Sequence, residues 1–248
     1  YNATATGLNN QILGTNADTL NISATAFASR WGTGRATGLK NSTIFFSGSN
    51  INISAYAKGR DAYAIGMLGS LIQACGCDDK TININAKSRV FSYDPAWGIQ
   101  RSAILTGAGN DSINITADAG YANRWGRRSG SLILAKGMEG SLLNTGSGND
   151  VITIKAIADG DRRSVANAIG IDQGSQVITG EGNDKVYVTA DATGIQSNAW
   201  AIRNSSIDTG KGDDLVSLTA KTWQTGWRRD PAYGAENSSI KLEQVMTS

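Results

Sequence analysis

The chain has 248 residues, a formal net charge of +2, 40% hydrophobic residues, 30 glycines and 2 prolines. Histidine is absent, which excludes catalysis and metal binding by imidazole. The two cysteines are too few for a disulfide framework, and no apolar run approaches the ~20 residues of a membrane-spanning helix.

Seven copies of one pattern follow each other along the chain, and each ends at an alanine. These alanines are separated by 31, 31, 31, 39, 34 and 30 residues: Ala24, Ala55, Ala86, Ala117, Ala156, Ala190 and Ala220. The last four copies begin with Thr-Gly-x-Gly-Asn/Asp-Asp, at Thr106, Thr145, Thr179 and Thr209. An internal period of this length is typical of stacked repeat architectures.

Within each copy, apolar and polar residues alternate, as in Ile113, Ile115 and Ala117. Strict alternation predicts a half-buried strand and not a helix. Because one unit cannot bury its apolar face alone, we expect the units to stack into a right-handed parallel β-helix. We predict about seven full coils of about 28–39 residues plus a partial eighth, with roughly three strands each. A β-sandwich with coincidental repeats is the alternative, but the same three inward positions recur in register in every copy.

A second pattern precedes each copy. It consists of a Gly-apolar pair, two or three polar residues and then Ser-x-Ile or a similar triplet. It begins at Gly7, Gly38, Gly66, Gly98, Gly137, Gly170, Ala201 and Gly234. Asparagines also recur at one outward position, where stacked amides can hydrogen-bond along the solenoid axis: Asn21, Asn52, Asn83 and Asn114.

The turn Gly-x-Gly-Asn/Asp-Asp-x-apolar resembles the RTX-type calcium-binding repeats of secreted bacterial proteins, over about nine residues in each of four coils. The whole coil resembles the long repeat proteins of bacterial and cyanobacterial surfaces. Two departures are that Thr replaces the first glycine and that each coil has one motif instead of two. The resemblance implies a calcium site whose candidate residues are Asp111, Asp150, Asp184, Asp214, Gly109, Gly148 and Gly182.

A physical argument also favours a cation at these turns. Stacked aspartates would lie about 5 Å apart and repel each other unless they turn to solvent or share a counter-ion such as Ca²⁺. The alternative is that Gly, Asn and Asp only satisfy the geometry of the turn. In coils two and three, Ser49 and Lys80 occupy the aspartate position, so Lys80 would neutralise the start of the stack without a metal ion.

Segments of variable length between each ladder alanine and the next Gly-apolar pair are rich in Arg and Trp; we call them the arms. Variable loops on a fixed repeat usually carry the binding surface, and Arg and Trp dominate interface energetics. The candidate binding residues are Arg124, Trp125, Arg127, Arg128, Arg162, Arg163, Trp223, Trp227, Arg228 and Arg229. The alternative is that the aromatic rings cover the solenoid and the arginine stems stack on them.

The expected function is a structural or adhesive scaffold in an extracellular or cell-surface assembly. We expect its partners to be protein neighbours or further copies of the chain, with acidic polysaccharide as another candidate and nucleic acid not expected. The alternative is a polysaccharide lyase or hydrolase. For that reading the off-pattern acidic residues worth testing are Asp159, Asp161 and Asp230, which lie among the arginines, but no convincing catalytic set is present. We expect residues 1–248 to form a single solenoid that is a segment of a longer repeat protein, because no initiator Met or signal peptide is present.

Overall fold

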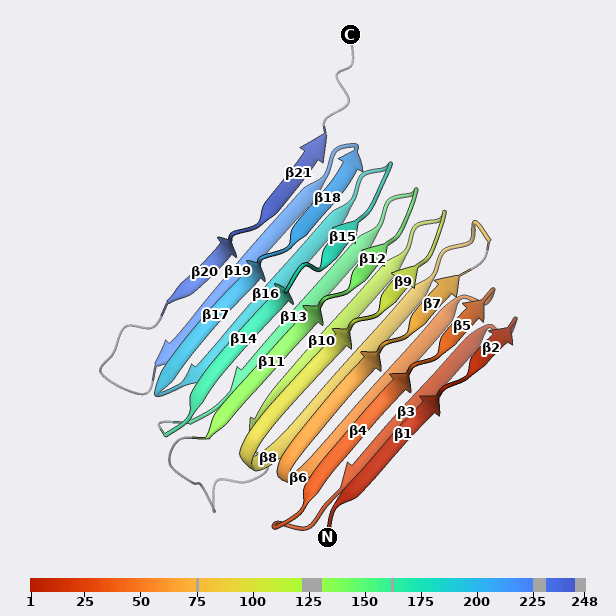
Figure 1. Cartoon of the computed structure of the whole chain (residues 1–248). Helices are drawn as coiled ribbons and strands as arrows, with labels where there is room; N and C mark the ends of the chain where they lie inside the picture. The colour runs from red at the N-terminus through yellow and green to blue at the C-terminus, as the bar shows by residue number, and fades with distance from the viewer. Residues whose placement is uncertain (75, 122–130, 162, 225–230, 244–248) are drawn as a thin grey trace.

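The computed structural model describes residues 1–74, 76–121, 131–161, 163–224 and 231–243, without the side chains of residues 90–92 and 224. Over these residues the protein is all β, contains no helix and forms a parallel β-solenoid of about 7 turns (Figure 1). The predicted fold class is therefore confirmed. The first and the last described strands lie at opposite ends of the rod.

Each coil contributes one strand to each of three stacks. The stack that carries the alanine ladder, here called the ladder layer, contains β3 (Thr19–Phe27), the first part of β6 (Asn50–Leu68), the first part of β8 (Thr81–Gln100), β10 (Ser112–Tyr121), β13 (Val151–Asp159), β16 (Lys185–Gly194) and β19 (Leu215–Gln224). The return layer contains β1 (Ala3–Asn9), β4 (Thr33–Lys40), the second parts of β6 and β8, β11 (Leu132–Glu139), β14 (Val165–Asp172), β17 (Gln196–Arg203) and β20 (Ala232–Glu236). The short sheet contains β2 (Ile12–Thr15), β5 (Thr43–Phe46), β7 (Leu71–Ala74), β9 (Ala103–Leu105), β12 (Leu142–Asn144), β15 (Gln176–Ile178), β18 (Ser206–Lys211) and β21 (Ser239–Glu243).

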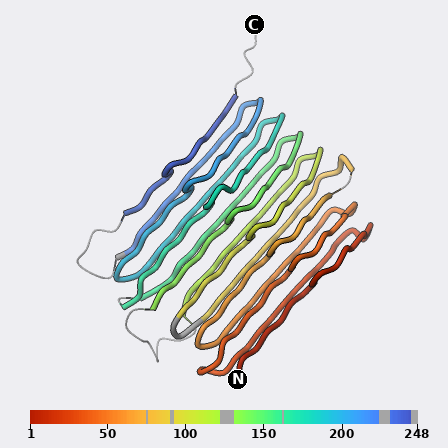
Figure 2. Tube along the Cα trace, in the orientation of Figure 1, coloured from red at the N-terminus to blue at the C-terminus, as the bar shows by residue number. Residues whose placement is uncertain are grey.

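The register of the ladder layer follows the repeat seen in the sequence. In β10, Ala117 pairs with Ala86 on one side and with Ala156 on the other, and the pairing is parallel. Each coil therefore places its inward residues directly above those of the coil before it. Figure 2 shows the resulting trace, in which long, nearly straight segments lie side by side.

The arms that follow Ala55 and Ala86 are regular strand segments. In β6 and β8 the chain passes from the ladder layer to the return layer within a single strand. The inward alternation continues through this region, where Ala62 and Ala64 are fully buried. Trp97 and Trp200, which the sequence placed in the arms, accordingly lie within β8 and β17.

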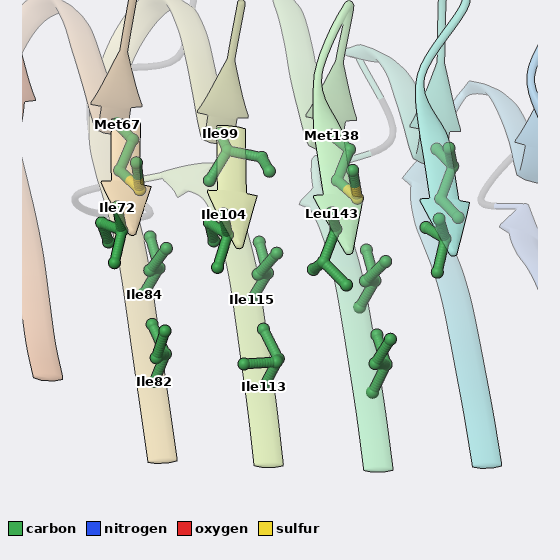
Figure 3. Close-up of a cluster of buried hydrophobic side chains, with 14 of the residues drawn as sticks. Met67, Ile72, Ile82, Ile84, Ile99, Ile104, Ile113, Ile115, Met138 and Leu143 are labelled. Carbon is green, nitrogen blue, oxygen red and sulfur yellow. The ribbon is translucent and has the colours of Figure 1, made fainter. Parts of the chain in front are cut away.

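The core has a wide part and a narrow part. Where the three stacks enclose the interior, it is filled by Ile, Leu, Met and Val side chains (Figure 3), including Ile84, Ile104, Ile115 and Leu143. Where only the ladder and return layers face each other, it is filled almost entirely by alanine. The alanine ladder therefore marks the end of the coil at which the two layers approach most closely.

The glycine of the first six Gly-apolar pairs has a packing role. A Cβ atom on Gly98 would lie 2.3 Å from Cγ2 of Ile115 in the facing layer, and Gly137 meets Ile154 in the same way at 2.3 Å. Only a residue without a side chain leaves room for the isoleucine opposite. The Gly-apolar pattern in the sequence thus results from the packing of the return layer on the ladder layer.

Candidate functional site

The acidic corner is the turn that enters each strand of the ladder layer in coils four to seven. Its glycines have positive φ angles, for example 89° at Gly146 and 134° at Gly148. A Cβ atom on Gly146 would lie 1.8 Å from the carbonyl oxygen of Gly107 in the preceding coil. Glycine is therefore required at this corner both by the backbone conformation and by the close stacking of consecutive turns.

The aspartates of this corner form a continuous ladder of hydrogen bonds. The main-chain N–H of Asp111 donates to Oδ1 of Asp150 at 2.8 Å, and the N–H of Asp150 donates to Oδ1 of Asp184 at 2.8 Å. The N–H of Asp184 donates in turn to Oδ1 of Asp214 at 2.9 Å. Each carboxylate thus satisfies a backbone donor of the preceding coil that the turn leaves without a strand partner.

These aspartates are not turned to solvent. Asp111, Asp150 and Asp184 are at most 1% exposed, on the same face of the chain as the core isoleucines. Their second oxygens, Oδ2, are buried and have no hydrogen-bond partner, and the same holds for Oδ2 of Asp214. The corner therefore contains a row of buried carboxylate oxygens that make no hydrogen bond of ordinary geometry and have only threonine hydroxyls nearby to oppose their charge.

Burial raises the pKa of three of these carboxyl groups, those of Asp111, Asp150 and Asp184. Loss of hydration raises the pKa of Asp150 to about 6, and the charges of Asp111 and Asp184 add to the increase. The same cause raises the pKa of Asp111 and of Asp184, although the Thr106 and Thr179 side chains and the backbone N–H donors act against it. The negative charge on this row is therefore unfavourable unless a cation or a proton compensates for it.

The residue before each aspartate forms a second ladder, in the opposite direction and on the exposed side of the corner. Oδ1 of Asn110 accepts the N–H of Asn149 in the following coil at 2.9 Å, and Oδ1 of Asn149 accepts the N–H of Asn183 at 2.7 Å. Oδ1 of Asn183 accepts the N–H of Asp213 at 2.9 Å. The aspartate and the residue before it therefore link coils four to seven, each to the next, which is the turn chemistry that the sequence offered as an alternative to calcium.

Lys80 closes the row at its N-terminal end. Its side chain is 1% exposed, and its Nζ donates to the carbonyl oxygen of Asp78 at 2.9 Å. Its main-chain N–H donates to Oδ1 of Asp111 at 2.7 Å, and its charge lowers the pKa of that group. A buried ammonium thus stands at the aspartate position of coil three, next to the first carboxylate of the row.

The donors that this corner offers to a cation are hard oxygen atoms. They are the Oδ2 atoms of the aspartates, together with hydroxyl oxygens such as Oγ1 of Thr145, which is buried beside the Asp150 carboxylate. Ca²⁺ prefers such carboxylate and neutral oxygen ligands. No group of three or more Cys, Asp or Glu side chains converges as a metal site within the described residues. A cation at this corner would therefore use one or two carboxylates with neutral oxygen atoms, and not a carboxylate cluster.

Most of the predicted arm residues lie outside the described part of the chain: Arg124, Trp125, Arg127, Arg128, Arg162, Trp227, Arg228 and Arg229. Two of the set are described. Trp223 is 61% exposed near the end of β19, and Arg163 is exposed with its main-chain N–H donating to Oδ1 of Asp161 at 2.9 Å. Both lie at the narrow, alanine-filled end of their coils.

The sequence did not single out a charged network on the outer side of the return layer. Nζ of Lys136 contacts Oε2 of Glu139 and lies 2.8 Å from Oδ2 of Asp172, whose carboxylate also pairs with Arg203 at 2.8 Å. Nε1 of Trp97 donates to Glu139 at 3.3 Å. Glu139, Asp172 and Arg203 occupy one outward position of successive coils, and Lys136 and Trp97 occupy the position three residues earlier, so the stacking of the coils joins these charges into one network.

This network is ion-paired. Lys136 and Gln100 outweigh burial and lower the pKa of Glu139, and Arg203 and Lys136 do the same for Asp172. Both carboxylates are therefore ionised at neutral pH, which suits inter-coil cross-linking and does not suit a general acid.

The acidic residues outside the repeat do not form a pair across a cleft in the described structure. Asp159 is exposed, and its pKa is raised by partial desolvation against the opposing effect of Arg89. Asp161 is buried and accepts the hydroxyl of Ser164 at 2.7 Å, as expected of a turn. Asp230 lies outside the described residues.

The serine of the second repeat pattern also forms a ladder. The N–H of Ser102 donates to Oγ of Ser141 at 3.2 Å, and the hydroxyl of Ser141 donates to the carbonyl oxygen of Glu139 at 2.8 Å. Each serine thus satisfies a donor of the preceding coil and a carbonyl of its own coil. The recurrence of this serine was visible in the sequence, but its role was not.

No protein-family model, no curated protein and no solved structure matches this chain. A search of the described residues for a helix long and apolar enough to span a membrane finds none.

Proposed function

We propose that the chain is a structural or adhesive scaffold of an extracellular or cell-surface assembly, and that calcium stabilises it at the acidic corner. The partners proposed for it are protein neighbours, further copies of the chain or an acidic polysaccharide, bound through the Arg/Trp-rich arms.

The observation that carries the calcium proposal is the row of buried Oδ2 atoms at Asp111, Asp150, Asp184 and Asp214, which make no hydrogen bond of ordinary geometry and have only threonine hydroxyls nearby. A buried carboxylate oxygen without a partner is costly, because its hydration is lost and nothing replaces it. A divalent cation between coils would supply the missing interaction and relieve the repulsion between neighbouring aspartates. The similarity of the turn to RTX-type repeats supports the same conclusion.

The arms support a role in binding. Trp223 and Trp31 are 61% and 65% exposed, and the guanidinium of Arg30 lies 5.0 Å from the centre of the Trp31 ring. Exposed tryptophan beside arginine suits a protein interface or an anionic ligand better than a solvated surface. The rod itself supports a scaffold role, because its repeated strands present these groups along one edge.

Thermal unfolding in calcium and in a calcium chelator tests the metal proposal. At a calcium concentration about 100-fold above Kd we expect Tm to rise by roughly 5–10 °C. Replacing Asp150 with Asn should abolish most of this rise, whereas the exposed control Asp159→Asn should retain it. An identical Tm in calcium and chelator would remove calcium from the proposal.

The scaffold proposal is tested separately by incubating the chain with acidic polysaccharides. We expect retention of the polymer without any shortening of its chains, and weaker retention after Trp223→Ala. Shortening of the polymer would support the alternative of a lyase or hydrolase.

A further inference from the structure

The outer surface of the ladder layer carries a patch that contains no charged residue. It occupies three outward columns across the first four coils, and we call it the neutral face. All of its residues are Ser, Thr or Asn: Thr19, Asn21, Ser23, Asn50, Asn52, Ser54, Thr81, Asn83, Asn85, Ser112, Asn114 and Thr116. Each is exposed or half-buried, and the residues between them are buried apart from Leu20, which packs against the core.

The solenoid does not itself require this composition. The same three columns in coils five to seven contain two lysines, Lys155 and Lys185, as well as the large side chains of Val151, Tyr187 and Leu215. These later residues occupy the same strand positions in the same parallel register. The uniform, uncharged composition of the first four coils is therefore a property of this surface and not of the fold.

The central column of the neutral face is held rigid by its amides. Nδ2 of Asn52 donates to Oδ1 of Asn21 at 2.8 Å, Asn83 donates to Asn52 at 2.9 Å, and Asn114 donates to Asn83 at 3.0 Å. This amide ladder confirms the pattern expected from the sequence. Each internal amide uses one of its two N–H groups and one of its lone pairs, so a second donor and a second acceptor remain for an external ligand.

An aromatic pair borders the neutral face on the side toward the narrow end of the coil. Phe27 is 62% exposed and packs edge-to-face against Tyr56, with ring centroids 5.4 Å apart. The pair follows the three columns along the strands of coils one and two. An exposed phenylalanine next to a polar grid provides an apolar platform that the grid itself lacks.

We propose that the neutral face binds an uncharged polysaccharide. Such a polymer presents closely spaced hydroxyl groups, which match amides and hydroxyls that each donate and accept, and apolar ring faces, which match Phe27 and Tyr56. The absence of charge on the neutral face selects against ionic ligands, because an ionic group bound there would lose hydration without gaining a counter-charge. A purely polar grid also lacks the apolar anchors that drive protein association.

The spacing of the grid favours an extended ligand. Coils repeat every ~4.8 Å along the rod and alternate residues every ~6.7 Å along a strand, so the grid offers hydrogen-bonding groups at regular intervals in two directions. Its positions are fixed before binding, which limits the entropy lost on association. Many weak contacts along one polymer then act together. This binding requires neither calcium nor any of the arginines and tryptophans named above as candidate binding residues, so it is independent of the function proposed above.

Sedimentation with insoluble cellulose, chitin, starch and xylan, in calcium and at high salt, tests the proposal. We expect the chain to sediment with at least one of them, because uncharged contacts resist screening. Asn83→Asp introduces a charge in the centre of the amide ladder and should weaken binding about tenfold. Phe27→Ala should weaken it as well.

The matched control lies on the other side of the molecule. In the return layer, Nδ2 of Asn198 donates to Oδ1 of Asn167 at 2.8 Å, so Asn198→Asp alters the same kind of inter-coil amide contact away from the neutral face. Asn198→Asp and Asp150→Asn should both bind as the unaltered chain does. The proposal is overturned by no sedimentation with any of the four polymers, or by equal losses in Asn83→Asp and Asn198→Asp. It is equally overturned if the neutral face proves to pair with a second copy, seen as a dimer that only Asn83→Asp dissociates.

Discussion

Asp150 and Asp111 occupy the same position of consecutive coils, and the side chain of the first accepts the main-chain N–H of the second at 2.8 Å. The bond uses only one oxygen of Asp150, and the other is buried, makes no hydrogen bond of ordinary geometry and has only the Thr145 hydroxyl nearby. The same carboxylate therefore accepts a main-chain N–H of the turn and introduces a buried negative charge into the turn. The stability of the acidic corner depends on the balance of these two effects.

Separating them requires two substitutions at Asp150. Asparagine keeps the Oδ1 acceptor and removes the charge, so Asp150→Asn should raise Tm in chelator at pH 7.5. Alanine removes the acceptor as well and leaves the N–H of Asp111 unsatisfied, which should cost about 1–3 kcal/mol in the free energy of unfolding. Chemical denaturation of both variants measures the difference, and equal stabilities would show that the hydrogen bond contributes nothing.

Without calcium, the protein should become less stable as the pH rises from about 4 to above 6. The pKa of Asp150 is raised from the ordinary 3.8 to about 6, so in this window the folded chain binds more protons than the unfolded chain. Stability is then greatest below the unfolded pKa and is lost as the pH rises through the folded one. Urea denaturation from pH 4 to 8 in chelator measures this slope, which Asp150→Asn should reduce. A stability that increased with pH over this range would contradict a buried, uncompensated charge at the acidic corner.

Gly148 should not tolerate a side chain. Its φ is 134°, and a Cβ atom would lie 2.0 Å from the carbonyl oxygen of Gly109. Gly148→Ala is expected to destabilise the fold by about 3 kcal/mol or more, from backbone strain and overpacking together. Gly14→Ala is the control, since nothing lies within 4 Å of a Cβ atom there. Equal denaturation midpoints for the two variants would refute this account of the corner.

The serine ladder should also contribute to the stability of each coil. Ser141→Ala removes the acceptor of the Ser102 N–H, which is buried, and should destabilise the protein by about 1–3 kcal/mol. Hydrogen exchange should show faster exchange at the Ser102 amide in this variant. Protection unchanged at that amide would mean that another group replaces the hydroxyl.

Loss of one partner from the charged network of Lys136, Asp172 and Arg203 should lower the stability of the protein more than the loss of an ordinary surface ion pair would. The Asp172 side chain is fully buried between Lys136 and Arg203. Asp172→Asn leaves a largely buried ammonium with one carboxylate fewer and is expected to cost about 3 kcal/mol or more. High salt should reduce the difference in the free energy of unfolding between the variant and the parent only slightly, because buried ion pairs are weakly screened. A difference that disappears in salt would place the network at the exposed surface.

The sequence by itself determined the coil and its register. Because one coil stacks on the next, residues such as Ala86, Ala117 and Ala156 must recur at a fixed interval, and alternation identifies which of them point inward. The ladder of Asn21, Asn52, Asn83 and Asn114 was predictable for the same reason: identical side chains one coil apart are neighbours in any parallel solenoid.

Only the tertiary structure decided what those positions contact outside their own ladder. The burial of Asp150, the packing of Gly98 on Ile115 and the pairing of Lys136 with Asp172 depend on how the layers face each other and where each strand bends. Repeat spacing contains no information on these contacts, because they join different positions of the repeat. The neutral face became apparent for a related reason: its twelve residues are scattered over nearly a hundred positions of the chain, and only the stacking of four coils brings them onto one surface.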